Sequence, residues 1–149
     1  MTRLFVLIAF VVATAFYAAA QETETATLIT DAGPVAVTVE IADDPDEITR
    51  GLMFRDSLDE GSGMLFDFGE VREANMWMKN VEIYLDMLFL SPDGTVIAIA
   101  RNAVPGSERR INPGVPVAGV LELGGGQAAA LGVEPGDRVE HAMFSTGNG

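Results

Sequence analysis

Apolar and polar residues alternate along several short stretches of the chain, which is typical of strands with one buried face. The alternation is clearest over residues 34–41, where valine or isoleucine occupies every second position. Residues 25–30 carry a second stretch, and Asp31-Ala32-Gly33 between the two favours a tight turn. The pattern predicts a β-hairpin at the start of the folded domain.

Further short apolar stretches follow, separated by turn residues such as Pro92-Asp93-Gly94. We expect about eight strands in all, and the six beyond the hairpin are placed at residues 64–68, 73–79, 85–91, 95–101, 117–123 and 138–144. Helices do not alternate with these strands. The pattern predicts a mainly β (or α+β) fold, a small antiparallel barrel-like or sandwich-like single domain with two short helices.

The first of these helices is expected to begin at Asp44, whose side chain can cap it, with Pro45 in the first turn. Gly51 would follow within the same segment. Two explanations for this glycine stay open: close packing against a neighbour, or termination of the helix. The second helix is expected over residues 127–131, with Gly132 placed to end it.

The N-terminus has the three parts of a secretory signal: a charge at Arg3, an apolar run from Leu4 to Tyr17, and the small residues Ala18-Ala19-Ala20. A retained membrane anchor is the alternative, although the run is at the short end for a spanning helix. We expect residues 1–20 to be a signal peptide and residues 21–149 to form one β-rich domain with a core over about 25–144. The domain would be exported, to the periplasm or the cell exterior.

The net charge of the chain limits the classes of molecule that it can bind. Its formal net charge is −13, and removal of Arg3 with the signal would make it −14. Such a surface repels nucleic acid phosphates and anionic lipid headgroups, so we expect no nucleic acid partner and no membrane contact after cleavage. Solubility of an exported monomer explains the charge without a specific role. The chain has no cysteine, so no disulfide supports the fold.

Trp77, Lys79 and Asn80 are the first candidates for a binding site. Trp77 is the only tryptophan of the chain and Lys79 the only lysine. If residues 73–79 form a strand, these two side chains share a face, and a cation beside an aromatic ring could clasp a ligand. The alternative is that the tryptophan belongs to the core and the lysine reaches into solvent.

Asp86 lies among apolar neighbours, from Tyr84 to Leu90, and a buried carboxylate needs compensation. One hypothesis pairs it with Lys79 or Arg55, with Arg50 also near in sequence, at the edge of a ligand pocket. The other has Asp86 accept hydrogen bonds from backbone N–H groups.

The sequence gives little support to three other kinds of chemistry. Met76, Met78 and His141 could bind Cu(I), although methionine more commonly fills gaps in a core. The acidic residues 43–47 lack the ligand spacing of a calcium loop. No nucleophile elbow and no phosphate-binding glycine loop is present. We therefore expect no catalytic residues, no resident metal ion and no cofactor.

Several segments, taken in order, resemble domain-of-unknown-function family 192. They are Arg50-Gly51-Leu52-Met53-Phe54-Arg55, residues 63–68, Trp77-Met78-Lys79-Asn80, residues 85–90, residues 93–96, residues 120–123 and residues 132–139. The resemblance spans about residues 35–140. It implies a compact β-rich domain, often exported, and it implies no activity. It gives weight to Trp77-Met78-Lys79-Asn80 and Asp86, which match the family's most distinctive positions.

These observations favour an exported, non-catalytic binding domain for a small polar ligand or a peptide or protein segment. Its expected pocket is formed by Trp77, Lys79, Asn80 and Asp86, with Arg50 and Arg55 close by. Two alternatives remain: an enzyme that uses Asp86 and Lys79 in acid–base chemistry, and a soft-metal carrier that uses Met76, Met78 and His141.

Overall fold

The hairpin expected near the N-terminus is present in the computed structural model, which describes residues 22–144. Strands β1 (Thr23–Thr30) and β2 (Gly33–Ala42) pair antiparallel along their whole length. Alternate side chains are buried along part of each strand: Ala26, Leu28 and Thr30 in β1, and Val37 and Val39 in β2. The period-two pattern of apolar residues therefore forms one face of the core.

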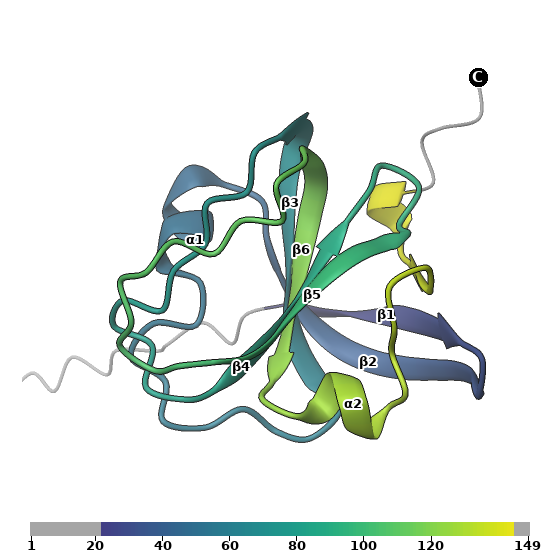
Figure 1. Ribbon diagram of the computed structural model, residues 1–149, viewed down its shortest axis with the longest axis horizontal. Coiled ribbons are helices and arrows are strands. Elements are labelled where there is room, and N and C mark those ends of the chain that lie inside the picture. The colour runs from purple at the N-terminus through teal and green to yellow at the C-terminus, as the bar shows by residue number, and fades with distance from the viewer. Residues whose placement is uncertain (1–21, 145–149) are drawn as a thin grey trace, which may run out of the picture.

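The remaining strands join this hairpin in one sheet, in the order β5-β4-β6-β3-β2-β1-β7 (Figure 1). β2 and β3 are parallel, connected through α1, and the other neighbours are antiparallel. The other elements are α1 (Pro45–Arg50), β3 (Ser62–Arg72), β4 (Leu85–Leu90), β5 (Val96–Ala103), β6 (Val117–Gly124), α2 (Gln127–Ala130), β7 (Arg138–Glu140) and the 3-10 helix Ala142–Phe144.

The seven-stranded sheet curls into a half-barrel, and its two edges approach one another. Thr95, just before β5, bridges to Arg138 of β7. The N–H of Val96 donates to the carbonyl of Asp137 at 2.7 Å, and that of Val139 donates to Gly94 at 2.8 Å. The expected mainly β fold with two short helices is confirmed.

The sheet separates two apolar clusters. Neighbouring residues of β6 supply both clusters, because side chains alternate along a strand: Leu121 and Leu123 enter the first, and Val120 enters the second. The second cluster lies on the side of α1 and contains Leu52, Met64, Phe66 and Met87 among its members.

The strand predicted at residues 73–79 is wrong. This segment makes one bridge, between Met76 and Ile111 of the long loop, and Met78 donates its N–H to the carbonyl of Ser107 at 2.9 Å. Because Ile111 lies in a loop, the pairing does not extend beyond this bridge into the hydrogen-bond ladder of a sheet. Two pairs of side chains expected to share a face still lie together. Met76 and Met78 both pack with the second apolar cluster, and the Lys79 ammonium nitrogen lies 5.2 Å from the centre of the Trp77 ring.

The last expected strand, residues 138–144, is also too long. β7 ends at Glu140, and residues 142–144 form the 3-10 helix. The only neighbour of β7 in the sheet is β1, with three residue pairs. The chain beyond Glu140 turns onto the sheet, where Met143 and Phe144 pack against the first cluster.

Helix α1 begins as expected. The Asp44 carboxylate caps it by accepting the N–H of Glu47 at 2.8 Å, and Pro45 is its first residue. Both explanations of Gly51 hold together. It ends the helix with φ of +46°, and a Cβ there would lie 3.0 Å from the ring of Phe66.

Within residues 22–144, no helix is both long and apolar enough to cross a membrane. The expected signal peptide, residues 1–20, lies outside the described residues.

Candidate functional site

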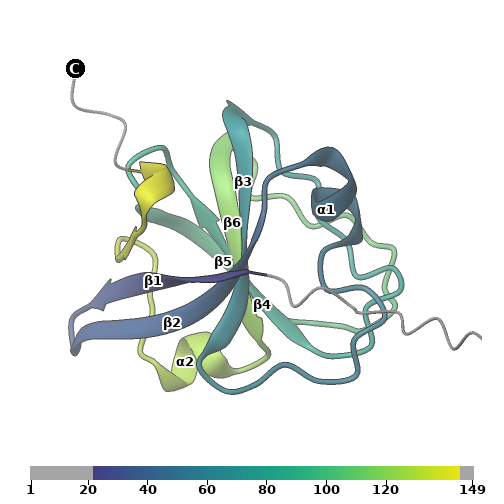
Figure 2. The same cartoon turned by 180° about the vertical axis from the view of Figure 1, so that it is seen from behind.

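A cavity of about 530 Å³ lies between α1, β3 and the segment that follows β3. Helix α1 stands beside β3 in both ribbon views (Figures 1 and 2). The turn at Gly51 sets the approach of the two, since a Cβ at this position would lie 3.0 Å from the ring of Phe66 of β3. The cavity has the size of a typical small-molecule site.

Aromatic rings and thioethers form the walls of this cavity. Phe66 and Phe68 come from β3, Met53 follows α1, and Met76 and Trp77 come from the segment after β3. Trp77 is 43% exposed, so one wall stands at the rim and is open to solvent. These side chains offer a large contact area to the apolar part of a ligand.

Glu122 of β6 is the buried polar group of the cavity. Its register partners are Met64 of β3 and Met87 of β4, both in the second apolar cluster. The side chain points to that side because Leu121 and Leu123 point to the other. The centre of the sheet thus presents a carboxyl group to the cavity from a residue that is only 4% exposed.

No residue of the described chain gives this carboxyl group a hydrogen bond or an ion pair. Burial alone raises the pKa of Glu122 to about 8. No completely enclosed side-chain oxygen or nitrogen of the described residues lacks a partner. The Glu122 oxygens therefore keep contact with the open space of the cavity rather than with a sealed core.

Charged residues of both signs stand at the rim. Asp43 and Arg50 flank the cavity from the α1 region, and Glu70 and Arg72 flank it from β3. All four are exposed, and the Arg72 guanidinium lies 4.1 Å from the centre of the Phe68 ring. The rim charges are hydrated, in contrast to the carboxyl group of Glu122.

Two of the six predicted ligand-binding residues, Trp77 and Arg50, line this cavity. Lys79 lies beside it: its ammonium nitrogen is 5.2 Å from the centre of the Trp77 ring and 3.8 Å from a Glu108 oxygen. Asn80 also lies at the edge, where its amide nitrogen is 4.0 Å from the sulfur of Met53.

Arg55 lies elsewhere, on the sheet. Its guanidinium forms a two-pronged ion pair with Glu40 of β2, with N–O distances of 2.5 and 2.6 Å. The hydrogen bond and the charge of Glu40 raise the pKa of Arg55. Arg55 therefore ties the chain after α1 to β2 and is not part of the cavity lining.

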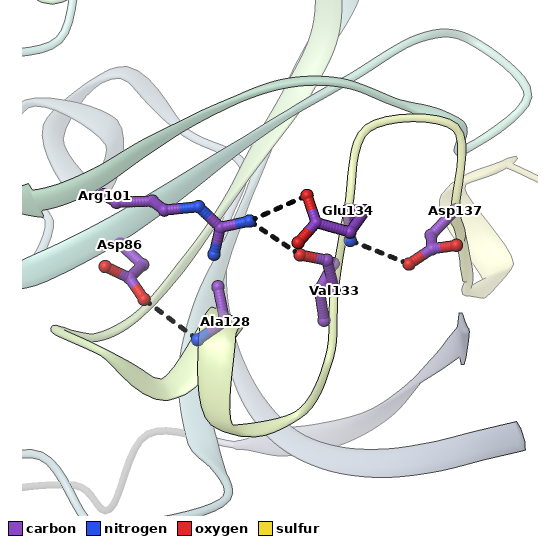
Figure 3. Close-up of polar contacts among 6 residues, drawn as sticks. All are labelled: Asp86, Arg101, Ala128, Val133, Glu134 and Asp137. Carbon is purple, nitrogen blue, oxygen red and sulfur yellow. Dashed lines mark hydrogen bonds and ion pairs between the residues drawn. The ribbon is translucent and has the colours of Figure 1, made fainter. Parts of the chain in front are cut away.

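The expected pairing of Asp86 with Lys79 or Arg55 is wrong. Asp86 is completely buried and accepts the N–H of Asn102 at 2.8 Å and that of Ala128 at 2.9 Å. Figure 3 shows the second bond, at the start of α2. The backbone N–H groups compensate this carboxylate, so Asp86 caps α2 and fastens β4 to β5.

Figure 3 also shows how the chain after α2 is held. Arg101 of β5 donates to the carbonyl of Val133 at 2.9 Å and to Glu134 at 3.2 Å, and Asp137 accepts the N–H of Glu134. These polar contacts belong to the scaffold.

The proposed copper ligands are not brought together. Met78 and Met76 pack with the second apolar cluster, whereas His141 follows β7 and bonds Glu24 of β1 at 2.9 Å. Among residues 22–144, no group of three histidine or carboxylate side chains is arranged to hold a metal ion.

A second, smaller cavity of about 420 Å³ lies between β5 and the long loop after it. Arg101, Arg109 and Arg110 line it. None of the six predicted ligand-binding residues belongs to this cavity.

Glu122 was missed by the sequence reasoning, although a signal was present. It is the one acidic residue in the apolar run 117–123, the same pattern that singled out Asp86. The sequence does not reveal which of two such carboxylates receives backbone N–H groups, because those groups come from residues distant along the chain.

Solved structures with the same fold include proteins from two organisms. One, from Sinorhizobium meliloti 1021 and named a candidate transcription regulator, is 50% identical with a TM-score of 0.80, and the match covers 83% of this chain and 96% of that one. Another, a protein of unknown function from Novosphingobium aromaticivorans DSM 12444, is 39% identical with a TM-score of 0.78, covering 80% and 85%.

No functionally curated protein resembles the chain closely enough to count as a match. The model of the DUF192 family, described as “Uncharacterized ACR”, matches residues 27–141, which include every described strand except the first part of β1. The expected resemblance is confirmed, and the chain belongs to the DUF192 family.

Proposed function

We propose that this protein is an exported, non-catalytic binding domain that holds a small molecule in the cavity between α1, β3 and the Trp77 segment. The observation that carries the proposal is the lining: aromatic and thioether walls surround one buried carboxyl group that has no partner among residues 22–144. Small-molecule sites combine these features, an apolar body and a few placed polar groups.

The geometry gives the two alternatives less support. Asp86 is engaged by backbone N–H groups and Lys79 lies beside Glu108, so the acid–base pair expected of an enzyme is not formed. The methionines and His141 of the metal-carrier hypothesis lie in separate parts of the described chain.

The name of the Sinorhizobium meliloti relative raises binding to DNA as a further possibility. The net charge of −13 argues against direct contact with phosphates, because proteins gain most of their affinity for DNA by neutralising phosphates with lysine and arginine. We retain a small-molecule ligand as the proposal.

Native mass spectrometry of the mature protein, purified from the exported fraction of its source cells, tests this function. We expect a polypeptide that begins at Gln21 and carries a bound small molecule. Trp77→Ala removes one wall of the cavity, and we expect it to weaken retention by about tenfold or more.

Tyr84→Ala is the matched control, because Tyr84 is an exposed aromatic residue outside the cavity lining. A polypeptide without extra mass, or equal retention by Trp77→Ala and wild type, contradicts binding in this cavity. A polypeptide that still contains residues 1–20, or that is absent from the exported fraction, contradicts export.

A further inference from the structure

The buried carboxyl group of Glu122 points to the chemical class of the ligand, an inference that rests on the cavity being the binding site proposed above. The cavity lining holds five ionisable residues, and Glu122 is the buried one. The exposed four, Asp43, Arg50, Glu70 and Arg72, stand at the rim. Glu122 is therefore the one ionisable group of the lining that a ligand meets beyond the rim.

The base of the cavity lacks a hydrogen-bond donor for this carboxyl group among the described residues. Its strand neighbours Met64 and Met87 have none in their side chains. An ionised carboxylate in such surroundings is strongly disfavoured unless a positive group compensates it. None of the described residues supplies this positive group. A ligand that carries a positive charge therefore gains the most binding free energy in this cavity.

The walls favour the same chemistry. Phe66, Phe68 and Trp77 line the cavity, and the faces of aromatic rings attract cations. Arg72 already lies over Phe68 in this way, at 4.1 Å. An anion would find no buried positive group in the lining, and the net charge of −13 favours the approach of cations from solution.

We propose that the cavity binds a small organic ammonium ion, a protonated primary or secondary amine with an apolar body, whose N–H groups donate to Glu122. The apolar body then packs on the aromatic and thioether walls. Glu122 acts as the ion-pair partner of the ligand and makes no covalent bond.

Binding releases a proton. In the free protein near neutral pH, Glu122 holds its proton, because burial raises its pKa to about 8. The ammonium ion pairs with the carboxylate, so the carboxyl proton leaves to solvent while the ammonium group keeps its own. Affinity for the amine therefore rises by up to about tenfold per pH unit below pH 8, and then levels off.

Isothermal titration calorimetry of the mature protein tests the proposal with matched probes. The amines are phenethylamine, hexylamine and cyclohexylmethylamine, and each is compared with the alcohol of the same shape. Measurements near pH 6, 7 and 8 in two buffers of different ionisation enthalpy count the protons released.

We expect at least one amine to bind about tenfold or more tighter than its alcohol near pH 8, and to release close to one proton near pH 7. Glu122→Gln keeps the shape of the side chain without its charge, and should abolish both the preference and the proton release. Glu82→Gln removes the same charge from an exposed residue outside the cavity lining and should retain both. Circular dichroism verifies that both variants are folded.

Equal binding of amine and alcohol, a preference that survives Glu122→Gln, or no binding of any amine overturns this inference. The proposed function fails separately, if the protein from the exported fraction carries no ligand. A retained ligand that is neutral or acidic would leave the binding function intact and contradict the ammonium class.

Discussion

Glu122 and Asp86 are both carboxyl groups on buried strands at the centre of the sheet, and they differ in what surrounds them. Asp86 accepts two backbone N–H groups, from β5 and from α2. Glu122 has no such donor and faces a cavity. Asp86 therefore stabilises the fold. The burial of Glu122 lowers the stability of the fold, as is common for groups that serve a function.

Glu122 should make the stability of the protein depend on pH. Its pKa is about 8 in the folded chain, against an ordinary value of 4.5 when unfolded. The folded state therefore binds one more proton between these values. Stability contributed by the protonated group is complete below pH 4.5 and is lost as the pH rises through about 8.

We therefore expect wild type to lose about 1.4 kcal/mol per pH unit relative to Glu122→Gln across this window. Urea denaturation of both proteins at several pH values measures the difference. Glu70→Gln, which is exposed, should follow wild type. Parallel curves for wild type and Glu122→Gln would show that Glu122 is not buried in its neutral form.

The sequence indicated the residue types of the site better than their arrangement. Trp77 was identified because it is the only tryptophan, and Arg50 was named as a cation near Asp86 in sequence; both line the cavity. Lys79 and Asn80 lie at the edge of the cavity, and Asp86 and Arg55 belong to the scaffold. The partners of these side chains come from distant segments, which the sequence does not order.

At the scale of the elements, the fold depends on how the two edges of the curled sheet meet. Gly94 allows this approach. It has φ of +83°, and a Cβ there would lie 2.2 Å from the carbonyl oxygen of Val139. That carbonyl belongs to β7, while Gly94 precedes β5. A side chain would separate the edges or distort the turn.

Gly94→Ala should lower the free energy of unfolding by about 3 kcal/mol, from the clash and the positive φ together. Thermal and urea denaturation measure this change. Gly114→Ala is the control, since Gly114 has φ of +81° and nothing within 4 Å of its Cβ position. If both variants lose the same stability, contact between the edges is not what requires Gly94.

The strands could be predicted where apolar residues alternate beside clear turns, as in β1 and β2, and where an apolar run is short and bounded, as in β4 and β6. The segment 73–79 was misjudged, because its composition suits a strand but its neighbour is a loop. The strand order, and the parallel pairing of β2 with β3, depend on contacts that no local pattern encodes.

At the scale of the whole molecule, a half-barrel with an apolar cluster on each face leaves one cluster open beside α1. The first cluster is covered by the hairpin, by α2 and by the C-terminal 3-10 helix residues. The second is covered by loops and one short helix, and it contains the cavity. Under the proposed function, one face serves the scaffold and the other carries the binding site.

The methionines report on these two faces separately. Met53 and Met76 line the cavity, whereas Met143 packs against the first cluster. NMR spectra of protein labelled with 13C at the methionine methyl groups, titrated with the small-molecule extract of the source cells, test binding in the cavity most directly. We predict shifts of Met53 and Met76 with Met143 unchanged. No shift of Met53 and Met76, or a shift confined to Met143, would contradict a ligand site on this face.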